Sequence, residues 1–539
     1  MPLKNNIYLF SNKIKNKDIF FQGYCFIGSD YIYGEEGALR YIEESGKAIP
    51  PGEDGCYVSI YNKDGVYSFV NDFHGYKKIF YYHREGVWVV SNSIVKIAEF
   101  LKDIGVQVSP NYAQLAAIGS SSASSMQQLN SYNTFVDGVK LLPSKSELKI
   151  CERFFKIVKL PQYKFPEKYE EALSEFLETW VSRAETLLTH KKMQVTCNLT
   201  GGVDSRTCFA IFQAARKRMK VQNSKLVFTC GTVGGDKSDL EVASLVARKF
   251  GIKLNDTDIY KPSLINGENA YKSWRYLCLG AYHPIYIPGR EINPYIVKIM
   301  GGGGGNHRSV YSKYLKTKSI TKFSSFCSKK IKPIWLGHQI YNDIMGFFKE
   351  QELNELNSAD PLIDHYAEFR NKFHAGRTPQ NMVAFHPLGS KYSNITSLDN
   401  FAGNNDTAKI NYDIIFSLEP ELLNLPFDRE YKAPSDEVKE QLVGVKLKEE
   451  SASGKVYVGE VENDEVLSST ARKNKYLILS DEVKKMLSNR FIIDFWGEEK
   501  VDKAKVVLKE LENKGKLFHA KDGQILSAIL ASSLFFNNN

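Results

Sequence analysis

The stretch from residue 193 to 260 alternates between strand-like and helix-like segments, and this alternation constrains the fold more than any other feature. The strand-like segments are MQVTCNL, KLVFTCGT and KLNDTDIY, at residues 193–199, 225–232 and 253–260. Between them, SRTCFAIFQAARKRM and SDLEVASLVARKFG have helical spacing over 205–219 and 238–251. The order strand–helix–strand–helix–strand is typical of a parallel sheet with crossover helices.

The loop between the first strand and the first helix reads NLTGGVDSR, at residues 198–206. In a parallel sheet this loop lies at the carboxyl edge, where ligands bind. Its glycines allow the backbone to approach an anion, and the amides at a helix start point toward it. Thr200 and Ser205 add hydroxyl donors, and Asp204 beside a phosphate requires a bridging cation, which predicts Mg²⁺. The alternative is an ordinary strand-to-helix turn of small residues.

The first 155 residues are predicted to be a layered, β-rich region. Hairpins are expected at Asp64-Gly65 and Glu85-Gly86, and a third within GVKLLPSKSELKI at 138–150. SIVKIAEFLKDIG predicts a helix that stops at Gly105, and residues 119–128 a polar loop. We therefore expect a first domain at 1–158 and a second at 159–539. The second begins with a long helix, YEEALSEFLETWVSRAETLL, and we expect a mobile loop at 446–465 and short helices from about 480.

Composition narrows the partners and the compartment. The formal charge is +9, from 71 basic and 62 acidic residues, and the lysines are scattered, so a solvated surface is favoured over nucleic-acid binding. The eight cysteines form no C-x-x-C pair, which predicts reduced, mostly buried thiols in a cytoplasmic protein. The N-terminus lacks a signal-peptide pattern, and no apolar run reaches the roughly 18 residues of a membrane helix.

The glycine loop, in its strand–helix setting, resembles the S-G-G-x-D-S pyrophosphate loop of N-type ATP pyrophosphatases, with Thr200 in place of the first serine. VFTCGTVGGDKSDLEVASLVARKFG and KIMGGGGGNHRSVY are similar to the next two segments of asparagine synthetases and β-lactam synthetases. The resemblance implies that ATP and Mg²⁺ bind here, with Asp204 and Asn306 as metal ligands. The implied nucleotide contacts are Leu199, Thr200, Gly201, Gly202, Asp204, Ser205, Cys230, Gly301 and Gly302. Five consecutive glycines favour a close backbone approach over a flexible linker.

The front region resembles the class II glutamine amidotransferase domain of the same enzymes, in DGCYVSIYNKDG, NDFHGYKKIFYY, VVSNSIVKIAEF and GVKLLPSKSELKI. The implied fold is an Ntn-hydrolase-like α+β sandwich followed by an α/β ATP pyrophosphatase domain, and the resemblance covers roughly residues 20–435. Two positions depart from the family. Pro2 replaces the nucleophilic N-terminal cysteine, so glutaminase activity should be absent, and Asn306 and His307 replace an acidic pair.

The remaining chemistry is that of an amide-forming ligase, which activates a carboxylate as an acyl-adenylate for attack by an amine. Its partners would be ATP and a small-molecule or peptide carboxylate, with a homodimer left open. In ELLNLPFDREYKAP, Lys432 and Arg429 are the catalytic candidates, with a surface lysine as the alternative. His386 and Lys391 could face substrate, although a structural role is favoured for His386. The other hypotheses are a non-catalytic nucleotide-binding homologue and a tRNA-modifying pyrophosphatase.

Overall fold

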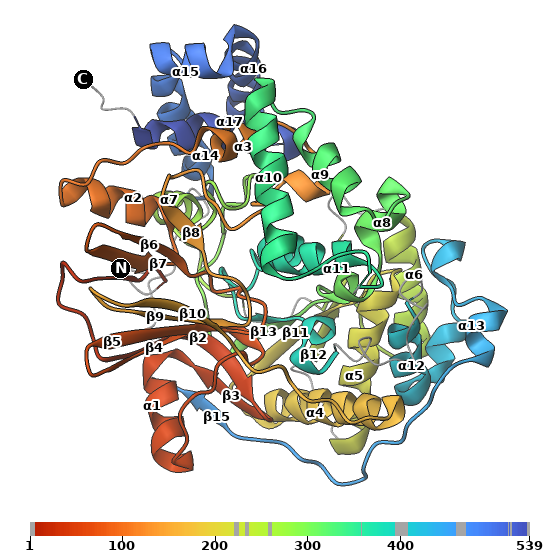
Figure 1. Cartoon of the computed structure of the whole chain (residues 1–539). Helices are drawn as coiled ribbons and strands as arrows, with labels where there is room; N and C mark the ends of the chain where they lie inside the picture. The colour runs from red at the N-terminus through yellow and green to blue at the C-terminus, as the bar shows by residue number, and fades with distance from the viewer. Residues whose placement is uncertain are drawn as a thin grey trace.

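The computed structural model describes residues 6–219, 226–231, 237–256, 261–356, 358–393, 408–459, 471–515, 517 and 520–535. The protein is a mixed α/β molecule in which a pair of stacked sheets lies beside a parallel sheet, with helices around both (Figure 1). All eight cysteines are free thiols, and Cys151 is the one that is not buried. Reduced, mostly buried cysteines were predicted from the sequence.

Residues 9–159, together with one strand at 456–458, form the two stacked sheets, in the strand orders β1-β7-β6-β8 and β10-β9-β5-β4-β2-β3-β15. The strands are β1 Leu9–Ser11, β2 Ile19–Ile27, β3 Asp30–Tyr33, β4 Gly55–Lys63, β5 Val66–Asn71, β6 Phe80–Arg84, β7 Val87–Ser91, β8 Val139–Leu141, β9 Ser146–Ile150, β10 Phe155–Lys159 and β15 Val456–Val458. Phe10, Ile60 and Trp88 belong to the core that the two sheets share. Helix α1 (Gly34–Ser45) packs on the larger sheet and α2 (Ile94–Asp103) on the smaller. The predicted layered, β-rich region is thus confirmed.

Two of the three predicted hairpins are present. Lys63 pairs with Val66 and Arg84 with Val87, so two-residue turns at Asp64-Gly65 and Glu85-Gly86 join the strands. All four turn residues have positive φ, between 50° and 81°, as this hairpin geometry requires. The third prediction is wrong: β8 pairs with β6 in one sheet, whereas β9 pairs with β5 and β10 in the other. The chain therefore crosses from one sheet to the other between β8 and β9. The sequence shows a turn there, but it does not show with which strands β8 and β9 pair.

The parallel sheet has the strand order β12-β11-β13-β14. Its strands are β11 Gln194–Asn198, β12 Leu226–Thr229, β13 Ile296–Ile299 and β14 Ala384–Phe385. Helices α4 (Tyr169–Thr189), α5 (Val203–Met219), α6 (Lys237–Lys249) and α12 (Lys409–Leu418) share one hydrophobic core with it. β12 lies on one side of β11 and β13 on the other, so the strand order reverses at β11. Ligands in open α/β sheets bind outside the strand ends at such a point.

The predicted third strand at 253–260 is wrong within the described residues. Leu254 makes a single parallel bridge to Phe228, and Asn255 then adopts a positive φ of 57°. Residues 257–260 lie outside the described part of the chain. The next strand of the sheet is β13, about forty residues later along the chain, after α7 (Gly267–Cys278).

A helical region covers the upper part of the molecule in Figure 1. It contains α3 Tyr112–Ile118, α8 Val310–Leu315, α9 Ile320–Ser328, α10 Ile334–Glu350, α11 Pro361–His365, a π-helical segment Tyr366–Ala375, α14 Ala471–Met486, α15 Arg490–Trp496, α16 Glu498–Lys514 and α17 Ala520–Ser532. These helices share a core with α2, α7 and the smaller sheet. The predicted C-terminal helices are confirmed, and no helix among the described residues has the length and hydropathy of a membrane span.

One strand crosses the domain boundary that we predict at residue 158. β15 lies within the predicted mobile loop at 446–465, yet it pairs with β3 of the larger sheet and buries Tyr457 against that sheet. The loop prediction is wrong for these three residues, and residues 460–465 lie outside the described chain. The second half of the protein therefore contributes a strand to the sheet of the first half.

Candidate functional site

Two glycine loops lie side by side at the carboxyl ends of β11 and β13. Cys197 pairs with Ile299, so the segment that follows Asn198 and the one that follows Ile299 leave the sheet at the same level. Residues 199–202 lead into α5, and the five glycines 301–305 lead into a short 3₁₀ turn, Gly304–His307. The fold therefore places both loops at the reversal of strand order.

The glycine run is packed tightly against its neighbours. A Cβ atom on Gly301 would lie 2.9 Å from the Cβ of Asp204, and one on Gly304 would lie 2.6 Å from Asp204 Oδ1. On Gly305 it would lie 2.6 Å from the hydroxyl of Tyr366. The prediction of a close approach over a flexible linker is confirmed, but the atoms approached in this structure are those of the protein itself.

The first loop is closed by its own side chains. Thr200 N–H donates to Ser205 Oγ over 3.0 Å, and the Gly202 N–H donates to Thr200 Oγ1 over 3.3 Å. The Gly201 N–H donates to the carboxylate of Asp239, 2.9 Å away, at the start of α6. The hydroxyls predicted as phosphate donors therefore lie in the loop and hold its shape.

Asp204 is held by a cation from the second loop. Arg308 Nη2 lies 3.0 Å from Asp204 Oδ1 and 2.7 Å from Oδ2, and its Nε donates to the Gly304 carbonyl over 3.1 Å. Asn411 Nδ2 on α12 also donates to Asp204 Oδ1, over 2.9 Å. The Arg308 and Asp204 side chains are 30% and 31% exposed, so this ion pair faces an open space.

That space is a cavity of about 810 Å³ lined by both glycine loops. Four basic side chains line it, those of Arg308, Lys313, Arg370 and Lys432, and Asp204 is the single acidic residue among the described residues that do so. His374 also lines the cavity, and burial with the nearby arginines lowers its pKa to about 3. A positively charged cavity beside a helix start fits a polyanion.

The predicted site residues divide into two groups. Seven line the cavity: Thr200, Gly202, Asp204, Ser205, Gly301, Gly302 and Lys432. Leu199 and Cys230 are buried and do not line it; their N–H groups donate to the Thr229 carbonyl and to Asn255 Oδ1. Gly201 packs against Asp428, and Arg429 is exposed outside the cavity.

Asn306 lies away from Asp204, contrary to the expected pairing of the two as metal ligands. It lines a second cavity, of about 310 Å³, together with Lys145 and Asp364. Its neighbour His307 donates from Nε2 to the Leu388 carbonyl, 2.9 Å away. Because the 3₁₀ turn redirects successive side chains, Arg308 rather than Asn306 reaches Asp204.

Arg206, at the end of the NLTGGVDSR string, is a site residue that the sequence did not reveal. It is fully buried, and its guanidinium donates to the carbonyls of Leu422 and Leu425 over 2.9 and 3.0 Å and to that of Pro426. It also stacks 3.8 Å from the Phe427 ring centre, and burial lowers its pKa to about 10. Arg206 thereby fixes the segment that ends in Lys432.

Lys432 is anchored on that segment at the cavity wall. Its ammonium pairs with Asp428, whose N–H donates to the Gly201 carbonyl over 3.2 Å. The side chain of Lys432 remains 34% exposed. This position is compatible with the predicted role toward a bound ligand, whereas Arg429 does not line the cavity.

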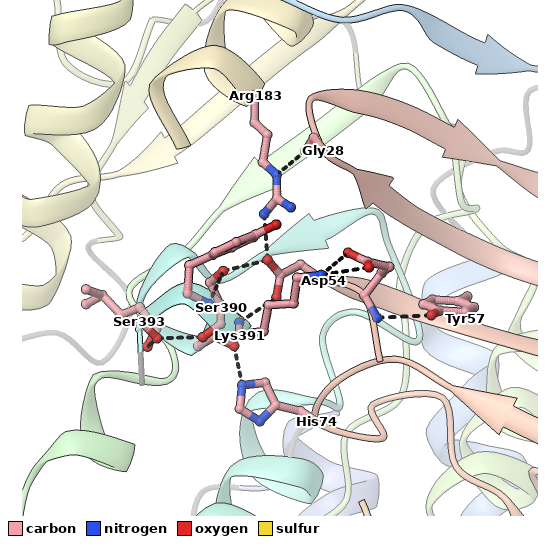
Figure 2. Close-up of polar contacts among 12 residues, drawn as sticks. Gly28, Asp54, Tyr57, His74, Arg183, Ser390, Lys391 and Ser393 are labelled. Atoms are coloured by element: carbon pink, nitrogen blue, oxygen red, sulfur yellow. Dashed lines mark hydrogen bonds and ion pairs between the residues drawn. The ribbon is translucent and has the colours of Figure 1, made fainter. Parts of the chain in front are cut away.

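Lys391 and His386 belong to the contact between the two halves of the protein. Figure 2 shows Lys391, and the centre of the His386 ring lies 5.7 Å from that of the Tyr76 ring. Lys391 pairs with Glu53 at 2.6 Å, and its N–H donates to Asp54 over 2.9 Å. Asp54 also pairs with Arg183 of α4 at 2.5 Å. His386 is buried, with a pKa lowered to about 4 by burial, and neither residue lines the large cavity.

The donor set of the cavity does not fit the Mg²⁺ that the resemblance implies. At phosphate sites Mg²⁺ is bound by one or two carboxylates together with the phosphates, but the single carboxylate among the described residues that line the cavity is already paired with a guanidinium. Among the described residues, no group of three or more His, Cys, Asp or Glu side chains could hold a metal ion.

Neither a scan against protein-family models nor a search of curated proteins finds a match to this chain.

Proposed function

We propose that this protein is an ATP-dependent, amide-forming ligase. ATP would bind in the large cavity, with its phosphates against the two glycine loops. A carboxylate substrate would then attack the α-phosphate, which breaks the bond between the α and β phosphates, releases pyrophosphate and leaves an acyl-adenylate. An amine would displace AMP and form the amide.

The observation that carries the proposal is the position and charge of the cavity. It lies at the reversal of strand order, beside the start of α5, and has four basic side chains against one carboxylate. A nucleoside triphosphate supplies the negative charge that such a surface attracts. Lys432 lies where it could stabilise negative charge that develops during adenylation.

The finer fold assignment is part of the same proposal. The stacked sheets with α1 and α2 on their outer faces are consistent with an Ntn-hydrolase-like domain, and the parallel sheet with an ATP pyrophosphatase domain. Pro2 lies outside the described residues. Because proline has no side-chain nucleophile, we propose that the first domain has no glutaminase activity and that the amine is supplied from elsewhere.

The test uses ATP labelled in its γ-phosphate, with hydroxylamine as the amine and aspartate, glutamate or a uronic acid as the carboxylate. Adenylation gives labelled pyrophosphate and a hydroxamate, whereas an ordinary ATPase gives labelled phosphate. Asp204→Ala should abolish pyrophosphate formation, because it releases the Arg308 guanidinium that Asp204 holds at the cavity, and it should not change the circular dichroism spectrum. Arg429→Ala is the control, because Arg429 is exposed and lies outside the cavity. Labelled phosphate alone would contradict the ligase assignment.

The second candidate is a nucleotide-binding protein without catalytic activity. It is favoured by the pairing of Asp204 with Arg308, since this leaves no uncommitted carboxylate among the described residues that line the cavity. This candidate predicts ATP binding with no cleavage in the presence of any of the carboxylates. Measuring binding and pyrophosphate release on the same preparation separates the two.

A further inference from the structure

We propose that Arg308 is the resident cation of the phosphate site, so that the chain binds phosphates without a divalent metal ion. The proposal rests on the proposed function only in naming ATP as the ligand. The phosphate site itself is argued from the contacts of Arg308. Its chemical class of ligand is a di- or triphosphate, free or as part of a nucleotide.

Arg308 occupies the position in which a metal ion beside Asp204 would be expected. Its Nη2 contacts both oxygens of Asp204, at 3.0 and 2.7 Å, and its Nε is held by the Gly304 carbonyl. Among the described residues, Nη1 has no hydrogen-bond partner, although Arg308 lines the cavity. A guanidinium fixed on one side and uncommitted on the other can donate two hydrogen bonds to a phosphate.

The glycine run makes this arrangement sterically accessible. A Cβ atom on Gly304 would lie 2.6 Å from Asp204 Oδ1 and 3.0 Å from Arg308 Nη2. A side chain at this position would therefore separate the carboxylate from the guanidinium. Glycine at position 304 therefore leaves room for the contact between Asp204 and Arg308, in addition to any approach of the backbone to a ligand.

The charge of the cavity points in the same direction. Arg308 offsets the charge of Asp204, and Asp428 partly offsets that of Lys432. The described lining also carries Lys313 and Arg370, so its basic side chains outnumber its carboxylate. A divalent cation would approach these groups against their repulsion, whereas a fully ionised phosphate chain would approach with their attraction. Asn306 does not supply a compensating oxygen, because it lines the other cavity.

The first measurement is calorimetric titration of the full chain with inorganic pyrophosphate and, separately, with ATP. Each titration is made in EDTA and again with excess Mg²⁺. We expect both ligands to bind in EDTA at least as tightly as with Mg²⁺. Binding that requires Mg²⁺ would overturn this proposal and leave the ATP-binding function standing.

Arg308→Gln is compared with Arg370→Gln, which removes the same charge from the same cavity. Arg370 donates to Gln127 and Gln128 and has no contact with Asp204. Arg308→Gln should weaken pyrophosphate binding in EDTA by roughly tenfold or more and should make it depend on Mg²⁺. Arg370→Gln should weaken binding but leave it independent of Mg²⁺. Equal behaviour of the two variants would contradict a specific role for Arg308.

Asp204→Asn gives the sharpest test, because the two accounts predict opposite signs. Asparagine keeps an oxygen that accepts from Arg308 but removes the negative charge beside the phosphates. If Arg308 is the cation, pyrophosphate binding should tighten in EDTA and in Mg²⁺ alike. If Asp204 is instead a metal ligand, the same change should weaken binding in Mg²⁺.

These titrations separate the nucleotide-binding function from the role of Arg308. Pyrophosphate binding without ATP binding would refute the nucleotide function and support the role of Arg308. Failure of the wild-type chain to bind either ligand, in EDTA or in Mg²⁺, would overturn both. In each titration, circular dichroism of the variants must match the wild type, so that lost binding is not lost folding.

Discussion

Two aspartate–arginine pairs, one between the two halves of the protein and one within the second half, have the same chemistry and opposite surroundings. Asp54 and Arg183 join the first sheet region to α4, and their side chains are 5% and 0% exposed. Asp204 and Arg308 join the two glycine loops, and theirs are 31% and 30% exposed. Both aspartates lie in strings that carry the family resemblance, DGCYVSIYNKDG and NLTGGVDSR.

The difference lies in how completely each carboxylate is used by the protein. Asp54 accepts from Arg183, from the Ser390 hydroxyl at 2.5 Å and from the Lys391 N–H at 2.9 Å (Figure 2). Burial raises its pKa, but these donors outweigh burial and hold the pKa below its usual value. The Asp204 pair instead lines a cavity. We infer that the first pair holds the two halves together and the second is available to a ligand.

The largest expected effect is on stability, through Arg183→Met. This change leaves Asp54 buried without its cation, and breaking a buried pair in this way costs roughly 3–5 kcal/mol. Arg308→Met should cost about 1 kcal/mol or less, because its pair is partly exposed. Urea denaturation midpoints of the two variants test the comparison directly. Similar shifts for both would mean that exposure does not distinguish the two pairs.

An intermediate effect concerns pH and His74, whose Nε2 contacts the Gly389 carbonyl in the same interface. Burial, together with the nearby Lys145, lowers the pKa of His74 to about 3. The unfolded chain binds this proton below about pH 6.5, whereas the folded chain does not until about pH 3. The wild type should therefore lose stability as pH falls through this window.

His74→Gln keeps a donor for the Gly389 carbonyl and removes the titration. As pH falls from 7.5 to 5, the urea denaturation midpoint of the wild type should fall more than that of the variant. A difference that does not change with pH would show that His74 titrates normally in the folded protein.

The smallest expected effect compares Lys432→Met with Arg429→Met. Lys432 lines the cavity but is partly neutralised by Asp428, so its loss should weaken pyrophosphate binding only about threefold. Arg429→Met should leave pyrophosphate binding unchanged, because this side chain is exposed and lies outside the cavity. A larger loss in Arg429→Met would reverse the assignment of the two residues.

The sequence was sufficient for features that local spacing determines. The hairpin turns at Asp64-Gly65 and Glu85-Gly86, the helix at 169–188 and the strand–helix order around the glycine loop all follow from periodicity and turn residues. That the two glycine loops line one site was implied by the family resemblance alone, and the parallel pairing of β11 with β13 brings both loops to one edge of the sheet.

The remaining features depend on long-range contacts or on the direction of a side chain. Asp54 and Arg183 are 129 residues apart, and nothing local identifies them as partners. In the second loop, a 3₁₀ turn decides that Arg308 and not Asn306 reaches Asp204. β15 has three residues within a hydrophilic stretch, too few to give a periodic signal, although Val456-Tyr457-Val458 is an apolar triplet.

Hydrogen exchange of the full chain, with and without saturating ATP, tests the central claim that the ligand binds between the two glycine loops. We predict slower amide exchange in peptides that cover residues 199–206 and 300–308. Peptides that cover 53–58 and 389–393, where the protein already satisfies Asp54, should be unchanged. Protection confined to the second pair of segments, or none in any of the four, would contradict the account.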